Sequence, residues 1–314
     1  MRASVAFVVL AGCATAGTPS QQQGTPDASG SNSHMPDAAP MCVQGGCDDQ
    51  NMCTIDMCVP ATGCMHMTNT CDDSNACTVD SCDMVMGCKH DLPHGTMTFN
   101  ATGAMQTFSV PTCVTSLHIV ASGAQGGNAE GGAGGLGATA TGDFTVTPGQ
   151  AVSILVGGRG VDYNANPPTS IYAQRGGTGG GGTFVVAGTT ILEIAGGGGG
   201  ASGRSGVGVG NGGPGQTTTA GQTPPGTAGA GGANGGGGGT ISNANGFHVG
   251  TGGGGYSGNG IGASDGSVSS YGTANEPGTA FVNGGAGGVG GSVGRSGGFG
   301  GGGAAGATGG GGGG

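Results

Sequence analysis

GGGGTFVVAGTTILEIAGGGGG, residues 179–200, contains both of the patterns that decide the fold of this chain. Thr183 to Val186 and Ile191 to Ile194 are rich in β-branched and aromatic residues, and Gly188 lies between the two runs. Such runs around a turn residue predict a β-hairpin. The flanking glycines bring no side chains to a core and lose much backbone entropy on folding. We therefore expect a mainly β fold in which backbone hydrogen bonds hold the glycine segments together.

Further strand-like stretches precede this hairpin. Runs rich in β-branched residues occur at residues 97–100, 106–110, 114–120, 143–147 and 151–156. Several of them end at proline or glycine turn residues, which is typical of strands. His118 lies within one run and has no acidic residue or cysteine close to it in the sequence. We expect His118 to pack within a strand and not to act in catalysis.

Composition and charge exclude several classes of protein. Glycine supplies 84 of the 314 residues, charged residues are 7%, and tryptophan is absent. Most glycines follow residue 121, so the second half of the chain cannot build a conventional enzyme core. The formal charge is −10, and the acidic residues concentrate in residues 41–94. No basic stripe is present, which argues against nucleic acid as a partner.

The chain begins with MRASVAFVVLAGC, residues 1–13. The mainly apolar run after Arg2 is too short to span a bilayer, which takes about 20 residues, but it fits the central region of a signal peptide. Its end, Leu10-Ala11-Gly12-Cys13, resembles the lipobox of bacterial lipoproteins. This resemblance implies that residues 1–12 are a removed leader and that Cys13 carries membrane-binding acyl chains such as palmitate. The alternative is an ordinary secretory signal in which Cys13 has no role.

The residues after the leader predict where the protein is held. Residue 14 is Ala and not Asp, which by resemblance to lipoproteins of enteric bacteria implies the outer membrane of the cell envelope. Residues 13–40 comprise Cys13 and a segment of mainly small and polar residues without apolar periodicity. Such a composition predicts a flexible tether. We expect the tether to hold the rest of the chain away from the membrane, exposed at the cell surface.

A 24-residue repeat follows the tether, within residues 41–94. Both copies have the spacing C-x5-C-x4-C-x5-C, starting at Cys47 and at Cys71. A dense cysteine block in an exported chain predicts disulfides. We expect each repeat to close on itself with two disulfides, while Cys42 and Cys113 pair with each other, pair with another chain or stay free. The disulfide candidates are Cys42, Cys47, Cys53, Cys58, Cys64, Cys71, Cys77, Cys82, Cys88 and Cys113.

The repeats resemble the short extracellular CTDC repeat of slime-mould matrix proteins, which many secreted bacterial proteins also carry. The likeness covers residues 47–94 and includes the Thr-x-Asp-x-Cys core in both copies. It implies a small module that disulfides stabilise in place of a hydrophobic core.

Oxygen-bearing side chains in the repeats leave three interpretations open. The first, which we favour, is that the Asp and Asn side chains form Asx turns. The second is that they are calcium ligands. The third is that Cys64 with His66, and Cys88 with His90, are zinc ligands. Zinc is disfavoured because close C-x2–4-C pairs are missing. The methionines of the repeats are expected to fill gaps over the disulfides and not to bind copper. The calcium candidates are Asp48, Asp49, Asn51, Asp56, Asp72, Asp73, Asn75 and Asp80.

Residues 95–314 resemble the glycine-rich extracellular domain of the anaplastic lymphoma and leukocyte receptor tyrosine kinases. The elements that carry the likeness are Ser122–Gly127, Gly142–Phe144, Ile154–Gly160, Gly284–Gly288 and Arg295–Gly300, in this order. The resemblance implies a jelly-roll-like β-sandwich with inserts of polyglycine-II helices, a three-residue-per-turn extended form like polyproline II. That family continues with closing strands, whereas this sequence ends at Gly314, so we expect either a truncated domain or a different closure.

These patterns together predict a protein that is not an enzyme. No kinase motif is present, and the His residues are scattered. We expect a surface lipoprotein that presents an adhesive or ligand-binding glycine-rich module to a protein or cell-surface ligand; the alternative is a passive component of the envelope or extracellular matrix. Aromatic residues within the glycine segments are expected either to contact a ligand or to act as wedges between glycine layers. They are Tyr163, Tyr172, Phe247, Tyr256 and Tyr271.

Overall fold

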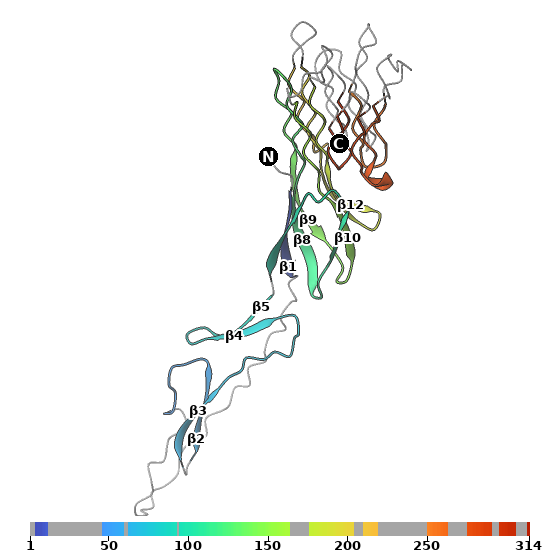
Figure 1. The fold of residues 1–314 in the computed structure, drawn as a ribbon. Coiled ribbons are helices and arrows are strands. Elements are labelled where there is room, and N and C mark those ends of the chain that lie inside the picture. The colour runs from blue at the N-terminus through green and yellow to red at the C-terminus, as the bar shows by residue number, and fades with distance from the viewer. Residues whose placement is uncertain are drawn as a thin grey trace, which may run out of the picture. The chain divides into compact units, whose positions relative to one another are not determined.

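The computed structural model describes the parts of the chain shown in colour in Figure 1. The chain divides into two compact units, one of residues Leu10–His94 and one of Met1–Val9 with Gly95–Gly314. The described residues are 4–11, 46–59, 62–92, 94–163, 176–203, 210–218, 250–262, 275–290, 295–305 and 313–314.

The repeat unit consists of two β-hairpins, one in each cysteine repeat. β2 (Thr54–Val59) pairs with β3 (Gly63–Thr68), and β4 (Val79–Asp83) pairs with β5 (Gly87–Asp91), both antiparallel. The first residue of β3 is Gly63, at φ 87°, and that of β5 is Gly87, at φ 80°. Glycine adopts this left-handed conformation without steric cost, so the same position ends the turn in both repeats.

Disulfides crosslink this unit, and three of them are Cys47–Cys64, Cys71–Cys88 and Cys53–Cys82. Two of them, Cys47–Cys64 and Cys71–Cys88, lie within one repeat each. The third, Cys53–Cys82, joins the first repeat to the second. The prediction that each repeat closes on itself with two disulfides is therefore wrong. Cys58, Cys77 and Cys113 are also disulfide-bonded, and Cys42 lies outside the described residues.

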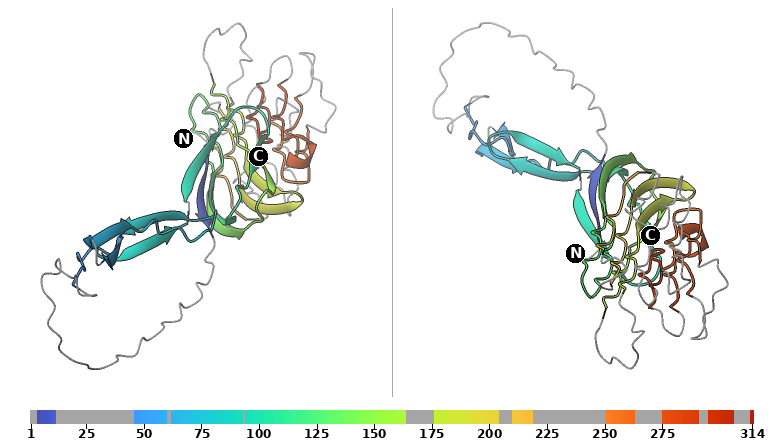
Figure 2. Two further views of the ribbon diagram at one scale, coloured as in Figure 1. Left: turned by 90° about the horizontal axis from the view of Figure 1, so that it is seen from below. Right: turned by 90° about the horizontal axis from the view of Figure 1, so that it is seen from above.

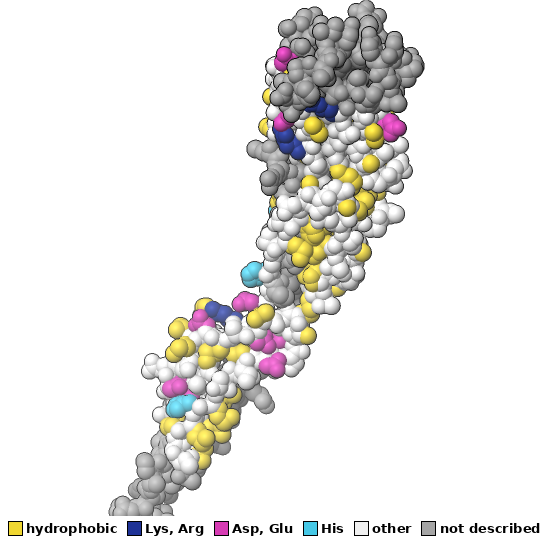
Figure 3. All heavy atoms as spheres, viewed as in Figure 1, with side chains coloured by type: hydrophobic (Ala, Val, Ile, Leu, Met, Phe, Trp, Pro, Cys, Tyr) yellow, Lys and Arg dark blue, Asp and Glu magenta, His cyan; other side chains and the backbone are white. Residues whose placement is uncertain are grey.

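The methionines of the repeats lie at the surface of the hairpins, and their role over the disulfides stays a prediction. Met57 and Met65 lie opposite each other on the first hairpin, with 44% and 43% of their surfaces exposed. The hydrophobic side chains on the surface of this unit are visible in Figure 3. A two-stranded hairpin has no second layer to cover its faces, which explains this exposure. The other exposed methionines of the repeats are Met52, Met67, Met84 and Met86.

The second unit contains two four-stranded sheets. In the first sheet the strand order is β6-β1-β8-β9, and in the second it is β12-β11-β10-β7. The predicted hairpin of residues 183–194 is present as β11 and β12, with Gly188 at φ 61° in the turn between them. The strands are β1 (Ser4–Ala11), β6 (Gly95–Asn100), β7 (Gln106–Ser109), β8 (Val114–Ser122), β9 (Thr139–Thr145), β10 (Ala151–Leu155), β11 (Thr183–Ala187) and β12 (Thr190–Ala195).

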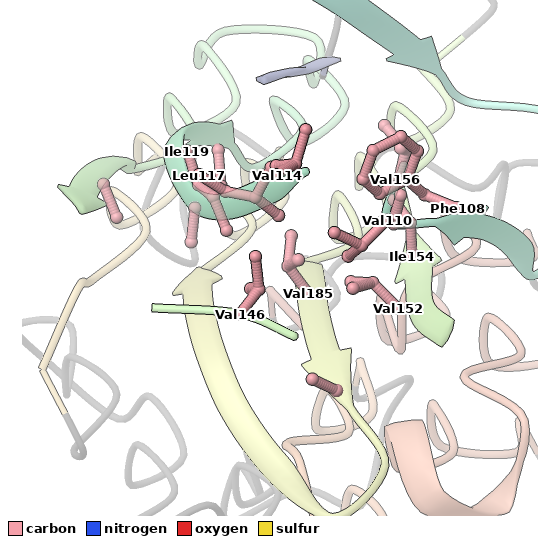
Figure 4. Close-up of a cluster of buried hydrophobic side chains, with 14 of the residues drawn as sticks. Phe108, Val110, Val114, Leu117, Ile119, Val146, Val152, Ile154, Val156 and Val185 are labelled. Atoms are coloured by element: carbon pink, nitrogen blue, oxygen red, sulfur yellow. The ribbon is translucent and has the colours of Figure 1, made fainter. Parts of the chain in front are cut away.

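One hydrophobic core lies between the two sheets, and Figure 4 shows its side chains pointing toward one another. Leu117 and Ile119 of β8 enter it from the first sheet. Val152, Ile154 and Val185 enter it from β10 and β11 of the second, and all five are fully buried. Burial on this scale stabilises each such side chain by about 1.5–3 kcal/mol. The mainly β architecture predicted from the sequence is confirmed, while the jelly-roll connections remain a prediction.

β11 is buried on both of its faces. Alternate residues of a strand face opposite sides of the sheet. Val185 therefore belongs to the core between the sheets, while Phe184 and Val186 belong to a second cluster. Phe281, in the short 3-10 helix Phe281–Asn283, joins that cluster with its ring centroid 5.4 Å from that of Phe184. This second core attaches the glycine-rich part to the outer face of the sheet.

The glycine segments form a network of backbone hydrogen bonds. Gly126 donates to the carbonyl oxygen of Gly135, Gly135 donates to Gly199, and Gly199 donates to Gly213. A Cβ atom on Gly135 would overlap the carbonyl oxygen of Gly213, so the spacing of these segments requires glycine. The expectation that backbone hydrogen bonds hold this half together is confirmed for the described segments.

The network differs from a β-sheet in the number of neighbours that each segment has. A strand in a sheet pairs with at most two others. Residues 177–182 instead exchange backbone hydrogen bonds with five segments. These five are residues 124–127, 158–161, 198–201, 298–303 and Gly314.

Candidate functional site: two Asp–Asp–His clusters

Each cysteine repeat places two aspartates and a histidine together. In the first repeat, Asp56 of β2 lies directly opposite His66 of β3, and Asp49 comes from the loop before β2. In the second repeat, Asp80 of β4 lies opposite His90 of β5. One ligand atom from each of the three residues lies within 4.8 Å of the others, and Asp73 completes the second cluster. The 24-residue period therefore repeats a three-dimensional arrangement and not only a cysteine pattern.

Asx turns form the loop before each hairpin. In the first repeat, the amide of Gln50 donates to Asp48 Oδ1 and the amide of Asn51 donates to Asp49 Oδ1. The amide of Cys53 donates to Asn51 Oδ1 at 3.0 Å. These local bonds are what makes Asp and Asn common in turns. The Asx-turn interpretation of these residues is confirmed.

The second repeat makes the same hydrogen bonds. Its loop has Ser74 N donating to Asp72, Asn75 N donating to Asp73, and Cys77 N donating to Asn75. The agreement shows that the recurring residues fix the loop conformation itself.

The carboxylate nearest to each histidine also ties the loop to the hairpin. Asp56 Oδ2 accepts from the amide of Asp49 at 3.1 Å, while Asp56 Oδ1 lies 2.7 Å from His66 Nδ1. His66 Nδ1 also lies 3.5 Å from Asp49 Oδ2. A protonated His66 therefore faces two carboxylates, and His90 does the same in the second repeat, 2.8 Å from Asp80 and 3.6 Å from Asp73.

The interaction within each Asp–His pair shifts the pKa values of both of its members. The hydrogen bond that His66 donates to Asp56 raises the pKa of His66, and the charges of Asp49 and Asp56 add to this effect. The same bond lowers the pKa of Asp56. The pKa of His90 is raised and that of Asp80 is lowered for the same reasons. Each pair therefore carries opposite charges over a wider pH range than two isolated groups would.

The donor set limits what metal the clusters can hold. Cys64 is bonded to Cys47, and Cys88 to Cys71, so neither offers a thiolate and the zinc sites proposed from Cys64 with His66 and Cys88 with His90 are wrong. Calcium takes oxygen ligands, whereas each cluster directs an imidazole nitrogen at its carboxylates. The calcium interpretation of the eight Asp and Asn side chains stays a prediction.

His118 has a partner that its sequence neighbourhood does not contain. Its Nδ1 lies 2.6 Å from Asp143 Oδ1, and its Nε2 lies 3.3 Å from Thr141 Oγ1. The antiparallel register of β8 and β9 places His118 opposite Asp143, although 25 residues separate them. The acidic partner of His118 therefore comes from a neighbouring strand, and the predicted place of His118 within a strand is confirmed.

Two of the five aromatic residues of the glycine segments, Tyr163 and Tyr256, lie within the described residues. Tyr256 stacks on Phe281 with ring centroids 5.5 Å apart and belongs to the second hydrophobic cluster, while a role as a wedge between glycine layers stays a prediction. Tyr163 lies beneath the guanidinium of Arg295, 5.6 Å from it. Tyr172, Phe247 and Tyr271 lie outside the described residues, as does Cys13.

Comparisons with known proteins place the cysteine repeats. A search of curated proteins finds no match to the chain. The model of the Dictyostelium (slime mold) repeat matches residues 46–68 and, again, residues 70–91. These ranges include both hairpins, both intra-repeat disulfides and both Asp–Asp–His clusters. The CTDC resemblance is thereby confirmed for residues 46–68 and 70–91.

Proposed function

We propose that the protein is a non-enzymatic lipoprotein of the bacterial cell envelope that presents its glycine-rich unit as an adhesive or ligand-binding module. The observation that carries the proposal is the disulfide-bonded repeat unit, because stable disulfides form in oxidising compartments outside the cytoplasm. The Leu10-Ala11-Gly12-Cys13 sequence supplies the anchor in this proposal. Among the described residues, no helix has the length and apolar character needed to cross a bilayer.

The build of the glycine-rich unit supports a role in presentation. Backbone hydrogen bonds, which need no enclosing core, tie residues 177–182 to five other segments. Such a network gives a rigid scaffold whose side chains are left for its surface. We also propose that these segments are polyglycine-II helices, as in the glycine-rich extracellular domain of the receptor tyrosine kinases that the sequence resembles. Their several neighbours fit a three-fold helix better than a strand.

Protease shaving of intact cells tests the location. Cells that express the wild type and a Cys13→Ser variant are treated with protease, and peptides released from the surface are identified by mass spectrometry. We expect peptides of residues 95–314 from wild-type cells and whole protein in the medium of the variant. Retention of the variant by the cells would contradict lipid anchoring.

A binding assay separates the adhesive function from its structural alternative. Purified protein is applied to cells and to isolated envelope proteins over a range of concentrations. Saturable binding is expected for an adhesive or ligand-binding module. Peptides that become accessible only after the outer membrane is broken, together with no saturable binding, would replace the adhesive role with that of a passive envelope component.

A further inference from the structure

β1 occupies an interior position in its sheet. It lies between β6 and β8, and its antiparallel ladder with β6 contains six residue pairs, from Ser4 opposite Asn100 to Val9 opposite Gly95. β1 is the only strand next to β6 in the sheet formed by the described residues. Figure 2 shows β1, in dark blue, among the strands of this unit. Removal of β1 would therefore separate β6 from the rest of its sheet.

The residues of β1 are also the apolar part of the proposed leader. Under the proposed function, cleavage before Cys13 removes residues 1–12, and β1 (Ser4–Ala11) leaves with them. The ladder groups of β6 and β8 that face β1 then lose their partners. Unpaired backbone groups away from water cost free energy comparable to a lost hydrogen bond. The mature chain would thus carry an open position for one strand.

The chemistry of the neighbouring strands defines what fits this position. Neither β6, GTMTFN, nor β8, VTSLHIVAS, contains Asp, Glu, Lys, Arg or Pro. Sheet edges that must not pair with other chains usually carry such residues. On the core side, Leu117 and Ile119 of β8 are fully buried, and Phe99 of β6 packs against the same core. The position therefore favours an extended, uncharged segment with apolar residues at alternate positions.

We infer that the processed chain accepts, between β6 and β8, an extended apolar segment of another protein. This inference rests on the proposed function, because the position opens only when residues 1–12 are removed. The bound segment completes the four-stranded sheet by main-chain hydrogen bonds, as β-strand addition does in other recognition modes. The length of the ladder with β6 indicates a segment of at least six residues.

A peptide with the sequence of residues 4–11, flanked by lysines for solubility and labelled with a fluorophore, is the probe. It is titrated into the processed wild-type protein in detergent and into a Cys13→Ala variant whose mass shows that residues 1–12 are retained. We expect saturable binding to the wild type and at least tenfold weaker binding to the variant, whose own β1 fills the position. Equal binding to both proteins overturns the inference.

Two altered peptides test the register. In the ladder, Val5 lies opposite Phe99, which packs against the core, while Ala6 lies opposite Thr98, which is exposed. A peptide with Val5→Asp is expected to bind at least tenfold more weakly than one with Ala6→Asp. Hydrogen exchange of residues 95–100 and 114–122 is expected to slow when the unaltered peptide binds. Equal affinity of the two altered peptides, or exchange that does not change, contradicts strand insertion.

The mass of the purified wild type separates this inference from the function on which it rests. A processed protein that does not bind the peptide overturns the inference alone. A wild type that retains residues 1–12 overturns both the lipoprotein proposal and the inference. A processed protein that dimerises, and whose dimer the peptide disrupts, shows a second copy as the occupant and overturns the assignment to another protein.

Discussion

Cys53 of the first cysteine repeat is bonded to Cys82 of the second, across 29 residues of sequence. The two hairpins are therefore one crosslinked unit and not two independent beads. A backbone hydrogen bond from the amide of Met52 to the carbonyl of Met84, at 2.9 Å, joins the repeats beside this disulfide. Since neither hairpin has a second layer to bury its faces, the crosslink supplies stability that packing cannot.

Loss of the inter-repeat disulfide is expected to uncouple the hairpins. The Cys53→Ser/Cys82→Ser double variant should lose about 2–4 kcal/mol of unfolding free energy, because the unfolded chain regains the freedom that the crosslink removed. Thermal unfolding measures the loss. The matched control, Cys47→Ser/Cys64→Ser, should leave the second repeat tied to Cys53 and lower the stability of the first repeat only. Peptide mapping that finds Cys53 bonded within its own repeat would contradict the pairing.

The histidine pairs predict that the repeat unit is most stable at mildly acidic pH. The pKa values of His66 and His90 are raised in the folded protein. Their contribution to the stability of the folded state is therefore complete below pH 6.5, the ordinary pKa of histidine, and is lost as the pH rises through the raised pKa values. The pKa values of Asp56 and Asp80 are lowered in the folded protein. Their contribution to stability is therefore complete above pH 3.8, the ordinary pKa of aspartate, and is lost as the pH falls through the lowered pKa values. Maximum stability is expected between these limits. Thermal unfolding across the pH range measures the profile.

A variant with both His66→Gln and His90→Gln tests whether the histidine pairs cause this dependence of stability on pH. The variant should lose less stability than the wild type as the pH rises, while its disulfides stay intact. His94→Gln is the control, because the described partner of His94 Nδ1 is the carbonyl oxygen of Leu92, at 3.2 Å, and not a carboxylate. If the double variant still loses stability at alkaline pH as the wild type does, the histidine pairs are not the cause of that loss.

The sequence predicts local structure in this chain better than it predicts which distant residues pair with each other. The hairpin of residues 183–194 and the Asx turns follow from residues close together in the chain, and both are present. The disulfide partner of Cys53 does not follow, because identical spacing in the two repeats fits pairing within or between them. The partner of His118 depends on the register of β8 and β9. That register pairs strands whose histidine and aspartate lie 25 positions apart, and no residue near His118 indicates it.

The second hydrophobic core was also missed, for a related reason. Phe184 and Phe281 are 97 positions apart in the numbering, and glycine-rich sequence separates them. Four consecutive apolar residues from Phe184 to Ala187 were a signal that β11 is buried on both faces, but they do not identify what covers the outer face. Only the path of the glycine segments brings Phe281 and Tyr256 there.

The close spacing of the glycine segments predicts a steep cost for a single methyl group. In Gly135→Ala, the new Cβ would overlap the carbonyl oxygen of Gly213, which is backbone and cannot rotate away. Displacement of the segment should cost about 1–3 kcal/mol or more, as overpacking does elsewhere. Gly262→Ala is the matched control, because its Cβ would make only an ordinary contact, 3.5 Å from the ring of Pro277. Similar melting temperatures for the two variants would contradict the network.

Phe281 is expected to hold the glycine-rich part to the outer face of the second sheet. Its ring stacks on Tyr256 and lies 5.4 Å from that of Phe184, and only 8% of the residue is exposed. Phe281→Ala should therefore cost about 3–5 kcal/mol of unfolding free energy, as truncation of a buried aromatic ring usually does. The neighbouring Val282 is 54% exposed, so Val282→Ala should cost little.

Urea unfolding measures both free energies, and near-ultraviolet circular dichroism reports the aromatic packing separately. Phe281→Ala should lose part of the aromatic signal, because the ring that stacks on Tyr256 is removed. The core between the sheets, which contains Val185 and not Phe281, should stay protected from hydrogen exchange. Loss of protection at β10 and β11 in this variant would instead show that the two cores unfold as one, and equal costs for Phe281→Ala and Val282→Ala would rule out the aromatic cluster as the attachment.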